Sequence, residues 1–327
     1  FYNADEPLIV ASVMKTAVLA AYAQEVVAGN IDPDEPVVVA EWEAFYLPLS
    51  DGGAHTMGLQ SLELEADTLG FAVDQTAVVT LDDLATIMMH YSGNAATDYL
   101  LEQVGVETVT AVLQTHLPSH TPINFTLGYA LVAFYHEAPF SVDWLQTVQT
   151  NIANGDQSDV TELIELYRHD AVWRAAQIDY VRNLTSGGVD AEAIWAYQTA
   201  AAQLLPKGAA REYAQMMAQI GSGQFVSPAV SQIMQEKLET APADWPLRAF
   251  YFTRFGAKDG LTAGVLAMAG YATPRRGNLG GQNRVVLLLA NGLSAQQLAR
   301  QSQLQGHYLL PIDLIRGTGS FDQFLQN

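Results

Sequence analysis

The sequence predicts an α+β fold, in which a helical body is inserted between pieces of one antiparallel sheet. Three strand-like runs, separated by Gly-rich or polar turns, fill the C-terminal third at residues 247–260, 262–273 and 283–291. Between residues 151 and 218 the pattern is mostly helical, with few β-branched runs. We therefore expect a single domain with a mostly helical half, residues 13–215, and a sheet-containing half, residues 1–12 plus 216–327.

Composition places the chain among globular proteins and limits its partners. Of 327 residues, 49% are hydrophobic and 15% are charged, which excludes a disordered chain. The formal net charge of −20 argues against nucleic acid and anionic membrane surfaces as partners. No apolar run reaches the roughly 18–20 residues of a membrane span, and no signal peptide is visible before Ser12.

Metal and nucleotide chemistry are not expected. The absence of cysteine excludes disulfides and thiolate–metal sites. His116 and His120 are four residues apart, but Pro118 between them prevents a helical metal pair. The Gly277–Gly281 stretch is predicted as a strand-connecting turn and lacks the context of a phosphate loop. The sequence therefore predicts no metal, no nucleotide and no other cofactor.

The first candidate motif pairs Ser12 with one of only four lysines in the chain, Lys15, in an otherwise apolar segment. Apolar residues recur at helical spacing from Ser12 to a stop at Gly29. Residues three apart share a helix face, so Ser12 Oγ and Lys15 Nζ can approach each other. An apolar setting disfavours the ammonium and leaves an amine that can take the serine proton. The alternative is a small capping serine beside a lysine that snorkels to water.

The second motif, Ser92-Gly93-Asn94, is predicted as a tight polar turn between two helices. Thr80 is the expected N-cap of the first helix, and the second is expected from about Ala95 to Val104, where Gly105 ends it. Ser92 and Asn94 can reach into a cleft from such a corner as a proton relay and an amide donor. Ordinary turn and cap chemistry is the alternative.

The third motif, Lys258-Asp259-Gly260, lies inside the first strand-like run of the C-terminal third. Small residues on both sides leave room for a ligand to approach the backbone. The alternative is a hairpin turn, which Asp-Gly often makes.

Together these motifs resemble S-x-x-K, S-D-N and K-T-G, which occur in this order in the serine β-lactamase and penicillin-binding protein superfamily. Flanking segments are similar to class A β-lactamases around S-D-N, in the late helices and in the last strand: residues 79–113, 205–238 and 283–292. The similarity covers about two thirds of the chain and fails in the middle, where extra helices from about residue 125 to residue 205 are expected.

The resemblance implies a role for each motif residue. Ser12 would be the acylated nucleophile and Lys15 its base. Ser92 would shuttle a proton, and Asn94 would hold the substrate amide. Such a site takes a small-molecule β-lactam, or a peptide-like amide or ester, as its substrate.

In the third motif, Lys258 would bind the substrate carboxylate beside Gly260, and the backbone N–H groups of Ser12 and Leu261 would form the oxyanion hole. The resemblance also implies a five-stranded antiparallel sheet with its helices, packed on an all-helical half with the active site between the halves. An extracellular or periplasmic location follows from it as well. Family members have a helix and two strands before the nucleophile, whereas eleven residues precede Ser12 here.

Three departures from the family pattern bear on activity. Gly93 replaces the aspartate of S-D-N, and Asp259 replaces the threonine of K-T-G. On a strand Asp259 should point away from Lys258, which would weaken its repulsion of an acidic substrate. The E-x-x-L-N string that supplies the deacylating glutamate is missing. None of the acidic residues nearby aligns with it: Glu137, Asp143, Glu162 and Glu165.

The sequence therefore predicts a serine hydrolase that forms an acyl-enzyme on Ser12, with β-lactam hydrolysis as the leading activity. A DD-peptidase or an esterase of the same fold is the first alternative. The second is a non-catalytic domain that binds cell-wall peptides or another protein, which the three departures motivate.

Overall fold

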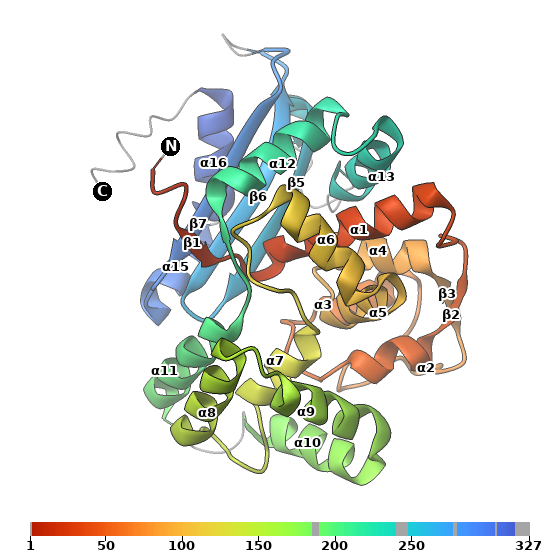
Figure 1. Ribbon diagram of the computed structural model, residues 1–327, viewed down its shortest axis with the longest axis vertical. Coiled ribbons are helices and arrows are strands. Elements are labelled where there is room, and N and C mark those ends of the chain that lie inside the picture. The colour runs from red at the N-terminus through yellow and green to blue at the C-terminus, as the bar shows by residue number, and fades with distance from the viewer. Residues whose placement is uncertain (1, 185–189, 240–247, 277–279, 305, 318–327) are drawn as a thin grey trace. The chain divides into compact units, whose positions relative to one another are not determined.

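The computed structural model describes residues 2–184, 190–239, 248–276, 280–304 and 306–317. Most of the predicted turn at Gly277–Gly281 lies outside them. The chain forms two compact units (Figure 1), each described by itself below. The sheet unit comprises Phe1–Asn30, Glu107–Ile123 and Pro206–Asn327, and the helical unit comprises Ile31–Val106 and Asn124–Leu205.

The sheet unit contains the predicted antiparallel meander. Strands β5, β6 and β7 pair in that order, which confirms the three strand-like runs and the α+β class. The unit consists of β1 (Pro7–Ile9), η1 (Ala11–Met14), α1 (Lys15–Ala28), α6 (Val106–His116), β4 (Lys207–Ala209), α12 (Ala210–Ser222), α13 (Pro228–Glu239), α14 (Arg248–Tyr251), β5 (Phe252–Thr262), β6 (Val265–Pro274), β7 (Arg284–Asn291), α15 (Ala295–Leu304) and α16 (Gly306–Arg316).

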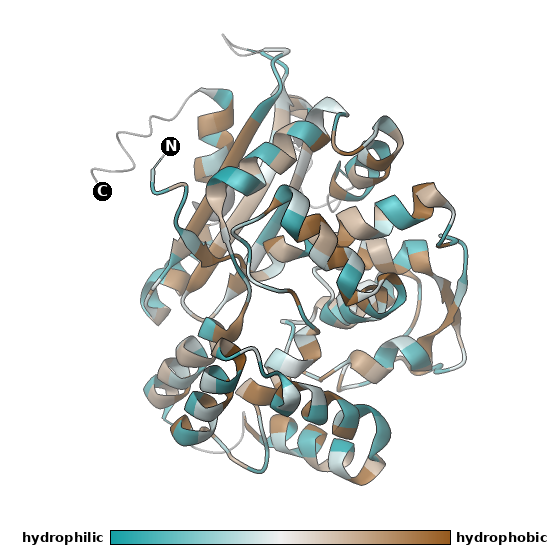
Figure 2. Ribbon diagram, viewed as in Figure 1, coloured by the Kyte–Doolittle hydropathy of each residue, from teal (hydrophilic) through white to brown (hydrophobic). Residues whose placement is uncertain are grey.

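The central strand β6 is buried on both faces, which explains why its sequence is apolar without alternation. On one face, Gly221 of α12 leaves room for the Tyr271 ring, which an added Cβ would approach to 2.9 Å. On the other face, Met268 and Ala272 join a cluster with Ile312 and Ile315 of α16. Hydrophobic residues therefore run along the strands in Figure 2, while α12 is hydrophobic on one side only.

The predicted boundary between the halves differs from the boundary between the units. Residues 13–215 would place α1 and α12 with the helices, but both pack in the sheet unit. Helix α12 packs on β6 and β7, and α1 packs on α13, which in turn packs on β5. Amphipathic periodicity identified these helices correctly but could not show which surface their apolar faces cover.

The five-stranded sheet implied by the resemblance is not seen among the described residues. The sheet unit has the three strands β5–β7 and a separate antiparallel pair, β1 with β4. Asn291, at the end of β7, joins the two. Its side chain accepts from the Ile9 N–H at 2.8 Å and donates to the Ile9 carbonyl at 3.2 Å. The chain that leads into Ser12 is thus fixed to the edge of the meander.

The helical unit is built from short helices and one small strand pair, β2 with β3. It contains β2 (Pro36–Val38), α2 (Val39–Trp42), η2 (Glu43–Phe45), α3 (Ala54–Ser61), β3 (Val78–Thr80), α4 (Leu81–His90), α5 (Asn94–Val104), α7 (Thr126–Ala133), α8 (Val142–Ala153), α9 (Ser158–His169), α10 (Ala171–Leu184), α11 (Ala191–Ala201) and η3 (Ala202–Leu204). Helices α7 to α11 fall within residues 125–205, where extra helices were expected.

The helix pair around the second motif forms as predicted. Thr80 caps α4 by a capping box: its side chain accepts from the Asp83 N–H, and the Asp83 carboxylate accepts from the Thr80 N–H at 2.9 Å. Gly105 ends α5 at a φ of 86°. Cap and periodicity signals are local, so the sequence alone suffices to place these two helices.

Two segments before α4 differ from what their local sequence patterns predict. The apolar run Val37–Ala40 predicts a short strand, but β2 ends at Val38, because α2 begins at Val39. The turn-rich residues 47–58 predict an exposed turn, but α3 begins there at Ala54 and the His55 side chain is fully buried. Tertiary contacts of His55, described below, override the local turn signal.

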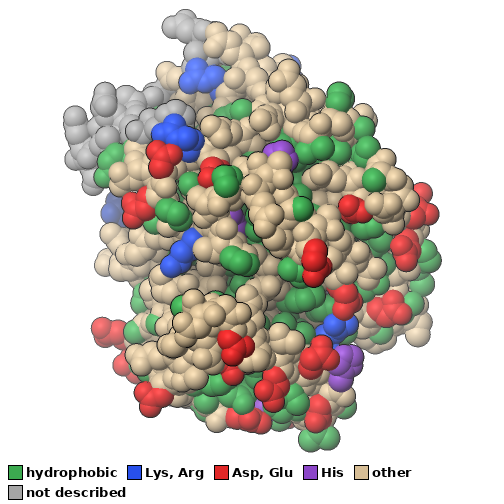
Figure 3. Space-filling view, viewed as in Figure 1, with side chains coloured by type: hydrophobic (Ala, Val, Ile, Leu, Met, Phe, Trp, Pro, Cys, Tyr) green, Lys and Arg blue, Asp and Glu red, His purple; other side chains and the backbone are tan. Residues whose placement is uncertain are grey.

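The acidic residues do not form a single block on the face that Figure 3 shows. Acidic side chains lie in separate small groups across the face shown in Figure 3, with few basic side chains between them. Within the described ranges, no helix is both long and apolar enough to cross a membrane.

Candidate active site

Ser12 lies on a tight turn of helix at the start of α1. This turn, η1, is a 3₁₀ helix, and the Lys15 N–H closes it by donating to the Ser12 carbonyl. In a 3₁₀ helix the side chains of residues three apart are eclipsed, so Ser12 and Lys15 lie on one side of the turn. The residue before the serine, Ala11, has a φ of 45°, in the left-handed region that a residue with a Cβ seldom adopts. The backbone is thus strained next to the candidate nucleophile.

Lys15 is fully buried. A snorkelling lysine keeps its ammonium in water, so that alternative for Lys15 is wrong. Neither η1 nor α1 has a side-chain cap, so Ser12 does not serve as a capping serine either. Burial without a capping role is what the hypothesis of a Ser–Lys pair requires of these two residues.

Gly260 brings strand β5 against the backbone of Ser12. A Cβ added to Gly260 would lie 2.6 Å from the Ser12 nitrogen and 3.0 Å from the Val10 carbonyl oxygen. Contacts this short are not tolerated, so only glycine allows this approach. Leu261, the next residue, is 55% exposed at the same place on the strand. Ser12, Lys15, Gly260 and Leu261 are therefore arranged together within the sheet unit.

Lys258 also lies on β5, and the strand continues through the motif, so the hairpin alternative is wrong. The chain turns only after Thr262, at Gly264, whose φ is 73°. The Lys258 side chain is buried, but its ammonium bends back to the Asp259 carbonyl at 3.0 Å and to Asp259 Oδ1 at 3.3 Å. Strand alternation does not separate the two charges as expected, because the lysine stem is long enough to reach across.

Ser92 and Gly93 form the corner between α4 and α5 in the helical unit. Ser92 has a φ of 66°, a second strained position within a candidate motif. Gly93 has an ordinary φ of −56°, so backbone conformation does not require glycine there. Packing does: an added Cβ would lie 2.8 Å from Cγ2 of Ile87. The aspartate of S-D-N is therefore excluded by the branched side chain of Ile87.

We predict that Gly93→Asp, which restores S-D-N, lowers the free energy of unfolding by about 1–3 kcal/mol through overpacking. Ile87→Leu moves the branch away from Cβ while keeping the volume, so the double variant should recover about 1 kcal/mol of that loss. Urea unfolding of the two single variants and the double variant measures this coupling. Additive effects would show that Ile87 does not exclude the aspartate.

Asn94 begins α5 and lines a small pocket within the helical unit. The other lining residues come from the end of η2 and the segment after it, from α5 and from α7: Phe45, Tyr46, Leu47, Ser50, Ala95, Thr126, Leu127 and Ala130. Thr126 is fixed beside Asn94, because its hydroxyl donates to the Asn94 carbonyl at 3.3 Å. The pocket is mostly apolar, with a few polar groups beside the candidate amide-binding residue.

The start of α7 is held by Asp98, one helical turn after Asn94. Asp98 is fully buried, and its two oxygens accept from the Thr126 and Leu127 N–H groups, each at 2.7 Å. A carboxylate at a helix N-terminus satisfies N–H groups that have no partner within the helix. Asp98 thus fixes one wall of the pocket.

No acidic side chain lines this pocket among the residues that the structure describes. Of the acidic residues considered from the sequence, Glu137 accepts from the Tyr135 hydroxyl at 2.5 Å and the Trp173 indole at 3.2 Å. Glu165 pairs with His169 on the surface of α9. The described ranges also contain no cluster of three or more potential metal ligands.

Sequence reasoning missed Glu43 and His55, whose buried side chains are hydrogen-bonded to each other at 2.9 Å. Glu43 carried the signal that singled out Lys15: it is a charged residue in an apolar segment, between Trp42 and Phe45. His55 carried no such signal, because it follows a run of turn residues.

The family model and the fold together support a serine β-lactamase-like hydrolase. The family model described as "Beta-lactamase enzyme family" matches residues 1–271. The chain belongs to this family. No curated protein matches the sequence.

Solved structures of β-lactamases and of a penicillin-binding protein share the fold. The β-lactamase of Chitinophaga pinensis is 11% identical, with a TM-score of 0.56 over 97% of this chain and 88% of that one. The β-lactamase of Sphaerobacter thermophilus is 15% identical, with a TM-score of 0.52 over 95% and 87%. A mutant of PBP-A, solved as an acyl-enzyme complex with penicillin G, is 14% identical, with a TM-score of 0.50 over 95% and 84%. At these identities the likeness establishes the fold alone.

Proposed function

We propose that this protein hydrolyses β-lactams through an acyl-enzyme on Ser12. The arrangement that carries the proposal is Ser12 on its strained 3₁₀ turn, with buried Lys15 on the same side and Gly260 against the Ser12 nitrogen. The family and the fold support the hydrolase class. The substrate and the turnover are the proposal.

In the proposed reaction, the neutral Lys15 amine takes the Ser12 Oγ proton while Oγ attacks the lactam carbonyl carbon. The N–H groups of Ser12 and Leu261 stabilise the oxyanion. The C–N bond then breaks, and the leaving nitrogen receives a proton through Ser92. Water hydrolyses the resulting ester and frees Ser12.

Substrate contacts complete the proposal. Asn94 donates to the amide of the acyl side chain, and Lys258 attracts the substrate carboxylate. Asp259 already holds the Lys258 ammonium, so the substrate carboxylate has to compete with it. An extracellular or periplasmic location, where β-lactams and cell-wall peptides are met, belongs to the same proposal.

A penicillin-binding protein that keeps its acyl group is the second candidate function. It is favoured by the lining of the pocket beside Asn94, where the described residues supply no carboxylate to activate a deacylating water. Asp98, the nearest buried carboxylate on α5, already accepts two backbone hydrogen bonds. A DD-peptidase or esterase activity would share the acylation step.

Intact-protein mass spectrometry after incubation with a labelled penicillin tests both candidates. We expect the mass to increase by one penicillin on the native chain and to stay unchanged on Ser12→Ala. An adduct that disappears with release of the opened product supports a β-lactamase, and one that persists supports the penicillin-binding candidate. If no β-lactam gives an adduct and none is opened, the β-lactamase and the penicillin-binding candidates both fail.

A further inference from the structure

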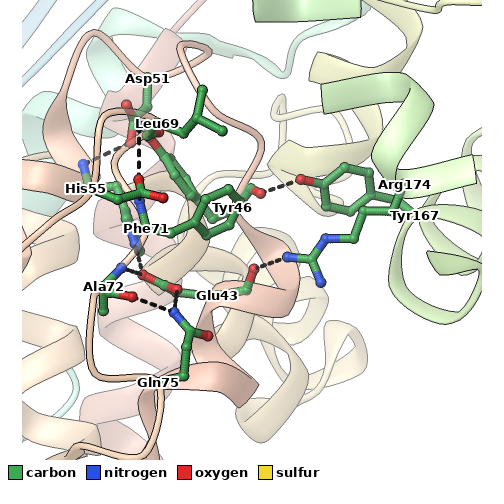
Figure 4. Close-up of polar contacts among 11 residues, drawn as sticks. Glu43, Tyr46, Asp51, His55, Leu69, Phe71, Ala72, Gln75, Tyr167 and Arg174 are labelled. Atoms are coloured by element: carbon green, nitrogen blue, oxygen red, sulfur yellow. Dashed lines mark hydrogen bonds and ion pairs between the residues drawn. The ribbon is translucent and has the colours of Figure 1, made fainter. Parts of the chain in front are cut away.

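The Glu43 side chain belongs to none of the three motifs, yet it is buried and its carboxylate accepts several hydrogen bonds. It begins η2, it is 1% exposed, and its carboxylate accepts three hydrogen bonds (Figure 4). The donors are His55 Nε2 at 2.9 Å, the Ala72 N–H at 2.7 Å and Gln75 Nε2 at 2.6 Å. A carboxylate is stable in such a buried place only with several donors. Glu43 thereby ties α3 and the segment before β3 to η2.

His55 is packed between two aromatic rings of the segment that contains Glu43. The Tyr46 ring stacks on it at 3.9 Å and 15°, and the Trp42 ring lies 4.5 Å away at 53°. The buried Nδ1 atom of His55 has no hydrogen-bond partner among the described residues. The ring therefore carries its proton on Nε2, donates to Glu43 and sets the position of Tyr46.

Two of the inserted helices, α9 and α10, donate hydrogen bonds to the main chain of residues 43–46. Arg174 of α10 donates to the Glu43 carbonyl at 3.0 Å, and the Tyr167 hydroxyl of α9 donates to the Tyr46 carbonyl (Figure 4). The Tyr46 hydroxyl in turn donates to the Leu69 carbonyl at 3.0 Å. Both the main chain and the side chain of Tyr46 are thus held by residues distant in sequence.

Residues Phe45–Leu47, which these hydrogen bonds hold, form one wall of the pocket beside Asn94. The Phe45 ring stacks on Phe125, with centroids 5.7 Å apart and planes at 6°, and Phe125 directly precedes Thr126, another lining residue. The width of the pocket therefore depends on where Phe45–Leu47 is held. The Glu43 cluster, with Tyr167 and Arg174, holds this wall.

We propose that Glu43, His55, Gln75, Tyr167 and Arg174 are positioning residues that set this wall and so determine which acyl side chains the site accepts. The inserted helices α9 and α10 would then influence which substrates are accepted, because Tyr167 and Arg174 hold the main chain of this wall. The inference rests on the proposed function for its substrate, a β-lactam or related amide whose side chain enters the pocket beside Asn94.

Tyr167→Phe tests the inference, with Tyr180→Phe as a matched control. The control removes a hydroxyl from the adjacent inserted helix that has no hydrogen-bond partner among the described residues. Hydrogen exchange of the peptide covering residues 43–50 reports the wall without any substrate. We expect about tenfold faster exchange there in Tyr167→Phe, from the loss of one buried hydrogen bond, and no change in Tyr180→Phe.

The second readout is the ratio of acylation rates for two penicillins, one with a small and one with a bulky acyl side chain. We expect Tyr167→Phe to change this ratio at least about threefold, whereas a purely structural role would change both rates alike. Unchanged exchange in residues 43–50, or an unchanged ratio, would overturn the inference. If the native chain is not acylated, the proposed function fails while exchange still tests the wall. Arg174→Gln replaces Tyr167→Phe if that variant does not fold.

Discussion

Lys15→Ala is expected to lower the rate of Ser12 acylation by a penicillin about 10²–10⁴-fold, the usual contribution of a general base. Serine is a weak nucleophile until a base takes its proton. Lys15 is fully buried at the start of α1, on the same side of the η1 turn as Ser12. Truncation removes the amine and leaves the turn itself intact. The free energy of unfolding should change by about 1–2 kcal/mol.

Rapid mixing with a fluorescent penicillin measures the acylation rate, and thermal unfolding checks the fold. Lys237→Ala is the matched control, because Lys237 also lies on a helix of the sheet unit but outside the three motifs. The control should acylate at the native rate. Equal rates for Lys15→Ala and the native chain would show that another group takes the proton.

Much of the fold could be predicted from the sequence where the signals are local. The capping box at Thr80, the glycine ends at Gly29 and Gly105, and the apolar runs of β5–β7 each depend on a few consecutive residues. Such signals locate an element and its ends. They also sufficed to place Ser12 at a helix start and Lys258 inside a strand.

Features that depend on tertiary contacts could not be predicted in this way. Glu43 bonds residues 12, 29 and 32 positions away through its carboxylate, and its carbonyl bonds Arg174, 131 positions away. Burial of His55 follows from these partners, so the turn-rich sequence around it was misleading. The sequence also could not predict that α1 and α12 belong to the sheet unit, because this depends on the surface that each helix covers.

The departures from the family motifs acquire a physical cause only in the structure. In the sequence, Gly93 is only a missing aspartate. In the structure, Ile87 occupies the space that a side chain at this position would need. Asp259 reads as a repulsive charge, but it holds the Lys258 ammonium. Both changes have therefore been accommodated by their neighbours, one by packing and one by charge pairing.

Gly260 is the motif residue whose role follows most directly from a contact, and Gly260→Ala is expected to lower Ser12 acylation at least about 100-fold. The new Cβ would lie 2.6 Å from the Ser12 nitrogen and 3.0 Å from the Val10 oxygen. These are backbone atoms, so no side-chain rotation can relieve the contact, and η1 has to move away from β5. A displacement of about 1 Å at a reacting group can cost a factor of 10² in rate.

Overpacking at Gly260 should also lower the free energy of unfolding by about 1–3 kcal/mol. Gly270→Ala separates this effect from catalysis, because its Cβ would lie 3.2 Å from Ala257 in the same sheet rather than against η1. Acylation rates and thermal unfolding of both variants distinguish a loss of catalysis from a loss of stability. We expect both to lose stability but only Gly260→Ala to lose acylation, because only Gly260 holds the strand against the Ser12 nitrogen. Native acylation by Gly260→Ala would mean that this contact does not set the geometry of the nucleophile.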